Sequence, residues 1–147
     1  MVRLEKVSVG AGANLRNSMS ERSIHDSRVV GYEVDGERRR IVLHTQFKAS
    51  DCIESIDIIF EGFLAYYFEN DNFGNILIGV EELPVAQLVG EYRSLFEEGA
   101  KCVWPGPWNQ SIEACVERFR SKGAKAFEIS FSYGLAGWII AESHRLQ

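Results

Sequence analysis

The sequence predicts an α+β domain with a mostly antiparallel sheet of about six strands and two helices packed on one face. Three observations predict this class. Several runs alternate apolar and polar residues, as strands on a core do. Two later segments, residues 81–99 and 110–122, repeat apolar residues at helical spacing. Hairpin-like turns join the strands, which favours antiparallel pairing and helices gathered on one face.

The chain has the length and composition of a single domain, residues 1–147. An apolar fraction of 46% and a charged fraction of 25% are typical of globular proteins. The three cysteines, Cys52, Cys102 and Cys115, are odd in number and have no CxxC spacing. They indicate reduced thiols and a cytoplasmic location. Since no apolar run approaches about 20 residues and no signal peptide is evident, we expect no contact with a membrane.

The N-terminal part carries weak signals. Residues 2–9 alternate and predict an edge strand, which Gly10 and Gly12 interrupt. A dinucleotide-binding fingerprint would need a third glycine and a preceding buried strand, and both are missing. Residues 14–27 are polar and predict a loop or a short frayed helix.

Residues 28–47 predict a β-hairpin. Asp35 and Gly36 lie between two β-rich runs, and a two-residue Asp-Gly loop suits a type I′ turn. That turn would place Glu33 opposite Arg38, a favourable pair of opposite charges. It would also place three apolar side chains on the inner face: Val30, Ile41 and Leu43.

The stretch from residue 55 to residue 80 is the most strongly patterned part of the chain. Its even positions form a nearly continuous apolar set: Ile56, Ile58, Phe60, Gly62, Leu64, Tyr66 and Phe68. We interpret it as a long central strand that turns at residues 70–75 into a partner strand at 76–80. A straight strand of this length would span roughly 50 Å, too long for the domain. Gly62 therefore marks a bend, which we favour, or a tight turn between two short strands.

Two helices and two strands follow. Pro84 suits the first turn of the first helix and Gly99 its end, with an apolar stripe of Val85, Leu88, Val89, Tyr92 and Phe96. The second helix has Ser111 or Asn109 as its cap, Gly123 as terminator, and a stripe of Ile112, Cys115, Val116 and Phe119. Residues 125–133 and 138–141 predict strands, before a polar tail.

Acidic residues concentrate in the centre of the chain. Residues 51–98 contain eleven acids and one base, Arg93, whereas the rest of the chain has a net charge of +5. Nucleic acid is an unlikely partner for this segment because phosphate binding needs clustered Lys and Arg. A basic protein is the partner we expect. The candidate partner-binding residues are Asp57, Glu61, Glu69, Asp71, Glu81 and Glu82.

No motif in the sequence identifies an enzyme. The three histidines, His25, His44 and His144, are far apart and have no metal-ligand spacing, so we predict no metal site, no cofactor and no catalytic residue. His44 is expected on the outer face of its strand. GxSxG is absent, although a triad assembled from distant residues stays open. Trp104 and Trp108 flank Pro-Gly-Pro and either bind a ligand or cover the end of the core.

The segment Ile58-Ile-Phe-Glu-Gly-Phe-Leu-Ala-Tyr-Tyr-Phe68, between Ile41-Val-Leu-His-Thr45 and Ile76-Leu-Ile-Gly-Val-Glu-Glu82, resembles small bacterial α+β proteins. Some of these resemble the immunity proteins of polymorphic or contact-dependent toxin systems. The resemblance covers about residues 29–98 and carries over no catalytic residue. It implies a non-enzymatic, toxin-neutralising module that binds a basic protein such as a nuclease toxin.

Two other functions stay open. One is a small enzyme or small-molecule binder with a pocket between helices and sheet, using Tyr66, His44 or Trp104. The other is a structural homo-oligomer, such as a homodimer formed through an uncovered sheet face or an edge strand.

Overall fold

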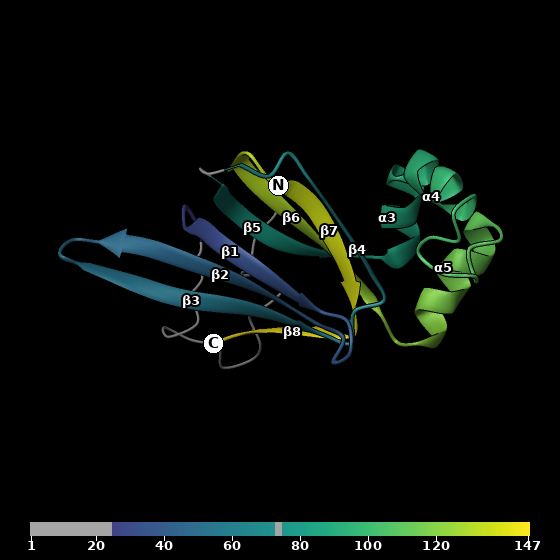
Figure 1. The fold of residues 1–147 in the computed structure, drawn as a ribbon, viewed down its shortest axis with the longest axis horizontal. Coiled ribbons are helices and arrows are strands. Elements are labelled where there is room, and N and C mark those ends of the chain that lie inside the picture. The colour runs from purple at the N-terminus through teal and green to yellow at the C-terminus, as the bar shows by residue number, and fades with distance from the viewer. Residues whose placement is uncertain (1–24, 73–74) are drawn as a thin grey trace.

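The computed structural model describes residues 25–72 and 75–147 (Figure 1). Its strands form one antiparallel sheet in the order β4-β7-β6-β5-β1-β2-β3-β8. The strands are β1 (Arg28–Asp35), β2 (Arg40–Ala49), β3 (Cys52–Glu61), β4 (Ala65–Glu69), β5 (Ile76–Leu83), β6 (Lys125–Tyr133), β7 (Ala136–Ala141) and β8 (Ser143–Leu146). The helices are α3 (Val85–Glu91), α4 (Arg93–Ala100) and α5 (Ile112–Ser121).

The predicted class, α+β with a mostly antiparallel sheet, is confirmed. The described residues form eight strands, not about six, and three helices, not two. The expectations for residues 2–9 and for Gly10 and Gly12 lie outside the described residues, as does most of the predicted loop at 14–27.

The sheet curls, so that β7 and β8, near its two ends, converge at one side of the molecule (Figure 1). Glu142 alone separates β7 from β8, although these strands lie near opposite ends of the sheet order. The Glu142 N–H donates to the Glu61 carbonyl, and the Leu64 N–H donates to the Ile140 carbonyl. The curled sheet encloses a first core that includes Val29, Ile41, Leu43, Ile58, Phe60, Leu77, Phe127, Ile129 and Ile139.

A second core lies between the helices and the outer face of β4, β7 and β6. Its centre is the fully buried ring of Trp138. This ring stacks on Phe96 of α4, with centroids 5.4 Å apart, and on Tyr67 of β4 at 6.1 Å. The helices therefore cover one part of one sheet face. The outer face of β1, β2, β3 and β8 lies away from all three helices (Figure 1).

The long central strand predicted across Gly62 is wrong. β3 ends at Glu61 and β4 begins at Ala65, and Gly62 between them has a φ of +66°. β3 pairs with β2 and β8, whereas β4 pairs with β7, so the connection is not a hairpin turn either. The predicted return strand, β5, pairs with β6 and β1.

The curl of the sheet explains why the alternating pattern predicted one long strand where the structure has two. Ile58 and Phe60 of β3 and Tyr66 and Phe68 of β4 all pack on the same enclosed core, from opposite sides. A period of two reports which side chains face a core. It does not report whether two runs belong to one strand.

The predicted hairpin is confirmed, but its loop has four residues, 36–39, and not two. Val34 lies opposite Ile41, and Arg39 has a φ of 55°. The Asp35 carboxylate accepts hydrogen bonds from the backbone N–H groups of Glu37 and Arg38, at 3.1 and 3.0 Å. Such an Asx-type turn favours the longer loop over the type I′ turn.

The new register changes the predicted inner face. Ile41 and Leu43 are fully buried, as expected. Val30 is 47% exposed because a bulge between Val29 and Gly31 turns Val29 inward instead. Glu33 lies opposite Val42 and not Arg38.

The first predicted helix is two helices. The break is at Tyr92 (φ −108°, ψ 31°), whose ring packs on Tyr67 and Trp138, with centroids 6.3 and 5.9 Å away. Gly99 does not end the second of them, since α4 continues to Ala100. A Cβ on Gly99 would lie 2.3 Å from the Trp104 ring, so this glycine permits close packing.

The second predicted helix is confirmed as α5. The Ser111 hydroxyl accepts a hydrogen bond from the Ala114 N–H at 3.0 Å, and Gly123 has a φ of +70°. Asn109 is not its cap: its buried amide donates to the carbonyls of Phe96 and Trp104. The predicted polar tail is β8, which pairs with β3.

Candidate functional site

The six predicted partner-binding carboxylates lie in four separate places. Asp57 and Glu61 lie on the outer face of β3, away from the three helices, and beside basic residues of the same molecule. The Glu61 carboxylate is 3.4 Å from Arg40 and 3.2 Å from Arg145. Asp57 is 2.8 Å from His44. These two acids are therefore compensated within the fold.

His44 connects three neighbouring strands. Its Nε2 lies 2.6 Å from Glu33 on β1, and its Nδ1 lies 2.8 Å from Asp57 on β3. The hydrogen bonds to Asp57 and Glu33 raise the pKa of His44. The side chain is 34% exposed, on the predicted outer face. Because both ring nitrogens are engaged, neither is free to take a proton from a substrate.

Glu69 and Glu81 lie in an acidic cluster, which we define as Glu69, Glu81, Glu91 and Glu128. Glu81 of β5 is directly opposite Glu128 of β6 in the sheet register. The same row continues through Trp138 of β7 to Tyr67 of β4. Burial raises the pKa of Glu128, and the charges of Glu91 and Glu81 raise it further.

The pKa of Tyr92 reflects the same concentration of negative charge. Burial raises the pKa of its phenol, and the carboxylates of Glu128, Glu69 and Glu91 raise it further. Glu69 accepts a hydrogen bond from the Tyr67 hydroxyl at 3.2 Å, and Glu91 accepts one from the Gln87 amide at 3.1 Å. These donors are neutral, so they leave the negative charge of Glu69 and Glu91 in place.

Glu91 and Glu128 were missed by the sequence reasoning. Glu128 was predicted only as an alternating position of a strand. The cluster depends on β5 pairing with β6, and on α3 ending above them, and neither contact has a local signal in the sequence.

Beside the acidic cluster, a groove follows the edge of β4 that faces away from β7. One hollow of about 610 Å³ is lined by residues that include Tyr66, Phe68, Leu95 and Trp104. A second, of about 450 Å³, continues past Tyr67 and Leu95 to Glu69 and Glu91. We call these two hollows together the edge groove.

Trp104 and Trp108 both pack against the helical core. Trp104 contacts Phe96 and Trp138, with ring centroids 5.5 and 6.1 Å away, and also lines the edge groove. Trp108 lies under the guanidinium of Arg118, 5.2 Å from the ring centroid. The two indoles therefore cover the end of this core, and one of them also borders a cavity.

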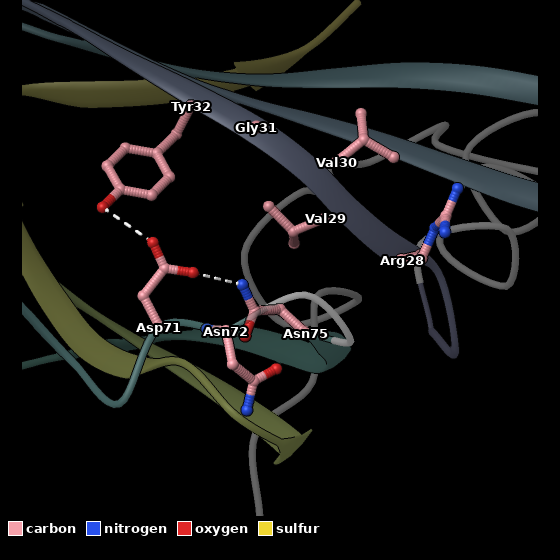
Figure 2. Close-up of a pocket in the computed structure, with 8 residues that line it drawn as sticks. All are labelled: Arg28, Val29, Val30, Gly31, Tyr32, Asp71, Asn72 and Asn75. Carbon is pink, nitrogen blue, oxygen red and sulfur yellow. Dashed lines mark hydrogen bonds between the residues drawn. The ribbon is translucent and has the colours of Figure 1, made fainter.

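Asp71 lies in a different cavity, a cleft of about 710 Å³ between β1 and the β4–β5 connection (Figure 2). The Tyr32 hydroxyl donates to one Asp71 oxygen at 3.3 Å, and the Asn75 amide donates to the other at 2.6 Å. Figure 2 shows Arg28 farther along the same wall. Asn75 is buried and also accepts from the Leu135 N–H, which fixes its orientation. Glu82, the sixth acid, borders a shallow hollow with Arg120 and Lys125.

The interface between helices and sheet, where the alternative function places a pocket, is filled mainly by apolar side chains. The cavities above lie at its margin and at the far side of the sheet. Cys115 within it is buried, which raises the pKa of its thiol to about 11. Such a thiol remains protonated and unreactive at neutral pH.

Within residues 25–72 and 75–147, no group of three or more His, Cys, Asp or Glu side chains could hold a metal ion. None of the helices built from these residues has the length and apolar character to span a bilayer. A scan against protein-family models and searches of curated proteins and of solved structures found no match to this chain.

Proposed function

We propose that the protein is a non-enzymatic binding module that captures a basic protein at the acidic cluster. The observation that carries the proposal is the concentration of carboxylates around Tyr92: burial raises the pKa of its phenol, and the charges of Glu128, Glu69 and Glu91 raise it further. Glu69 and Glu91 are exposed, and their hydrogen-bond donors, the Tyr67 hydroxyl and the Gln87 amide, are neutral. This surface therefore attracts a cationic partner.

A basic protein fits this surface better than a nucleic acid does. The cluster offers carboxylates, and the whole chain has a net charge of −5. Complementary charge accelerates encounter and disfavours wrong partners. A toxin-neutralising role is the specific form of this function that the sequence resemblance implies, with the cationic surface of a nuclease toxin as the partner.

The test uses charge reversal on the full chain. Immobilised protein is incubated with lysate of the source cells, and retained proteins are identified by mass spectrometry. We expect a basic protein whose association slows by about tenfold or more in the Glu69→Lys, Glu91→Lys variant. A matched control, Glu37→Lys with Glu117→Lys, changes two exposed acids elsewhere by the same charge.

The association rate should also lose most of its salt dependence in the first variant but not in the control. Equal rates for the two double variants would overturn the proposal. Retention of acidic or neutral proteins alone would overturn it as well.

A second candidate function is small-molecule binding in the cleft of Figure 2. The observation that favours it is the meeting of the Tyr32 hydroxyl, from β1, with the Asp71 carboxylate and the Asn75 amide, from the opposite side of the cleft. Ligand pockets typically combine an apolar lining with a few such groups. Screening a fragment library by NMR tests it: shifts at Gly31 and Tyr32 that vanish in Asp71→Asn would support binding there.

A further inference from the structure

β4 forms one end of the sheet. Its five residues pair with β7 on one side, and on the other side no strand among the described residues pairs with it. Along an edge strand, every second residue directs its N–H and C=O away from its neighbour. β4 therefore presents a row of backbone donors and acceptors to whatever lies beside it.

The edge groove lies next to this free edge, with α4 as its other wall. Its two ends differ in chemistry. Toward Trp104 the lining is aromatic and aliphatic, with Tyr66, Phe68 and Leu95. Toward the acidic cluster it is charged, with Glu69 and Glu91.

Two bases near the groove within the described residues, Arg93 and Lys101, are already paired. Arg93 binds Glu97 at 2.9 Å, and Lys101 binds Glu98 at 2.9 Å. The hydrogen-bond donors to Glu69 and Glu91 are a hydroxyl and an amide. The charge that the groove offers to an incoming chain is therefore negative.

We propose that the edge groove receives an extended segment of the partner protein, which adds to β4 as a further strand of the sheet. The partner's basic character rests on the proposed function. The segment places an apolar side chain near Trp104 and a Lys or Arg near Glu69 and Glu91. Strand addition of this kind derives affinity from main-chain hydrogen bonds and specificity from pockets for alternate side chains. Five residues, about 17 Å, match the length of β4.

Charge argues against a second copy of this chain as the occupant. Antiparallel pairing of two β4 strands about Tyr67 would bring Glu69 and Glu91 of both copies to one interface. That interface would contain four carboxylates beside bases already engaged in ion pairs of their own. A cationic segment meets no such repulsion.

The test compares two peptides on the full chain. The probe is the acetylated and amidated heptapeptide Lys-Val-Lys-Val-Lys-Val-Lys. The control peptide has the same sequence with N-methyl groups on residues 2–6, which removes the backbone donors but keeps the charge. We expect calorimetry to show at least about tenfold weaker binding of the methylated peptide.

NMR spectroscopy identifies where the peptide binds. The unmethylated peptide should shift the amide signals of residues 66–69 and slow their exchange with solvent, and should leave those of β8, the other end strand, unchanged. The Glu69→Lys, Glu91→Lys variant should weaken binding at least about fivefold, and the Glu37→Lys, Glu117→Lys control less than about twofold.

Three results would overturn strand addition. They are equal binding of both peptides, protection of β8 in place of β4, and β4 amides already protected in the free protein because another part of the chain or a second copy occupies the edge. Equal binding of both peptides, together with a strong effect of Glu69→Lys, Glu91→Lys, would contradict strand addition but not the proposed function. If neither N-methylation nor the charge reversal weakened binding, both strand addition and the proposed function would be contradicted.

Discussion

Glu81 and Glu128 lie directly opposite each other on β5 and β6, two carboxylates at a position where adjacent strands favour opposite charges or apolar pairs. Replacing Glu128 with Gln should raise the free energy of unfolding at pH 7 by about 0.5 kcal/mol, within the range known for cross-strand pairs. The pKa of Glu128 is raised in the folded protein, so the folded state binds its proton first as the pH falls. The gain should therefore shrink by pH 4.

Urea unfolding at pH 7 and pH 4 measures this difference. Glu117→Gln on the exposed face of α5 is the control and should change little at either pH. If Glu128→Gln were destabilising at pH 7, the two acids would not repel in the folded state. The same variant should slow the capture of a basic partner, so stability and binding are expected to change in opposite directions.

His144 makes the fold sensitive to acid. Its ring lies 4.9 Å from the Phe127 ring and 6.1 Å from the Phe60 ring, and burial lowers its pKa to about 4. Lys125 adds to this shift. Since the unfolded chain takes up this proton near pH 6.5, stability should fall between about pH 6.5 and pH 4, by roughly 3 kcal/mol at the lower end.

The His144→Phe variant should lack this component of the pH dependence. Urea unfolding at pH 7.0, 5.5 and 4.5 compares the two slopes. Parallel curves for wild type and variant would show that folding does not lower the pKa of His144.

His44 should act in the opposite direction. Its pKa is raised by hydrogen bonds to Asp57 and Glu33, so the protonated imidazole stabilises the fold below pH 6.5. This stabilisation is lost as the pH rises through the raised pKa. His44→Gln should therefore lower the melting temperature more at pH 6 than at pH 9, and NMR titration of the imidazole should give a pKa above 6.5. A pKa at or below that value would contradict the bridge between β1 and β3.

Gly137 allows β7 to approach β4. A Cβ at this position would lie 2.0 Å from the Tyr67 carbonyl oxygen, a backbone atom that can move only if β4 moves. We expect Gly137→Ala to destabilise the protein by about 1–3 kcal/mol, the usual cost of overpacking. It should also weaken peptide binding at the edge groove.

The matched control is Gly31→Ala, since nothing lies within 4 Å of a Cβ built there. Its unfolding free energy should remain within about 0.5 kcal/mol of wild type. Thermal unfolding of the two variants, with the peptide titration described above, separates them. An equally stable Gly137→Ala variant would mean that β4 is loosely held.

Local patterns predicted the parts of the fold that depend on neighbours in sequence. The stripe of Cys115, Val116 and Phe119 located α5, with Ser111 as one of its two predicted caps, and alternation located β6 with correct ends. The hairpin of β1 and β2 followed from Asp35 and Gly36, although the Asp35 carboxylate selects a longer loop. Tyr92 divides the first helix because its ring packs between Tyr67 and Trp138, and no helix rule encodes that contact.

The candidate site could be predicted only in part for the same reason. The sequence indicated an acidic centre, and Glu69 and Glu81 do belong to an acidic cluster. Glu61 shows the limit, because its neutralising partners, Arg40 and Arg145, come from the two strands that flank β3. Strand order decides which acids lie beside a base, and strand order in a curled sheet is a property of the whole chain.

Because Glu142 alone links β7 to β8, residues 142–147 connect the two sides of the curled sheet. The N–H of Glu142 bonds to the Glu61 carbonyl, and Gln147 exchanges two backbone bonds with Asp57. Deleting residues 142–147 would thus remove β8 from the sheet and expose the edge of β3. It would also remove His144 from between its aromatic neighbours. Residues 142–147 therefore hold the curled sheet closed, although they contribute little to either hydrophobic core.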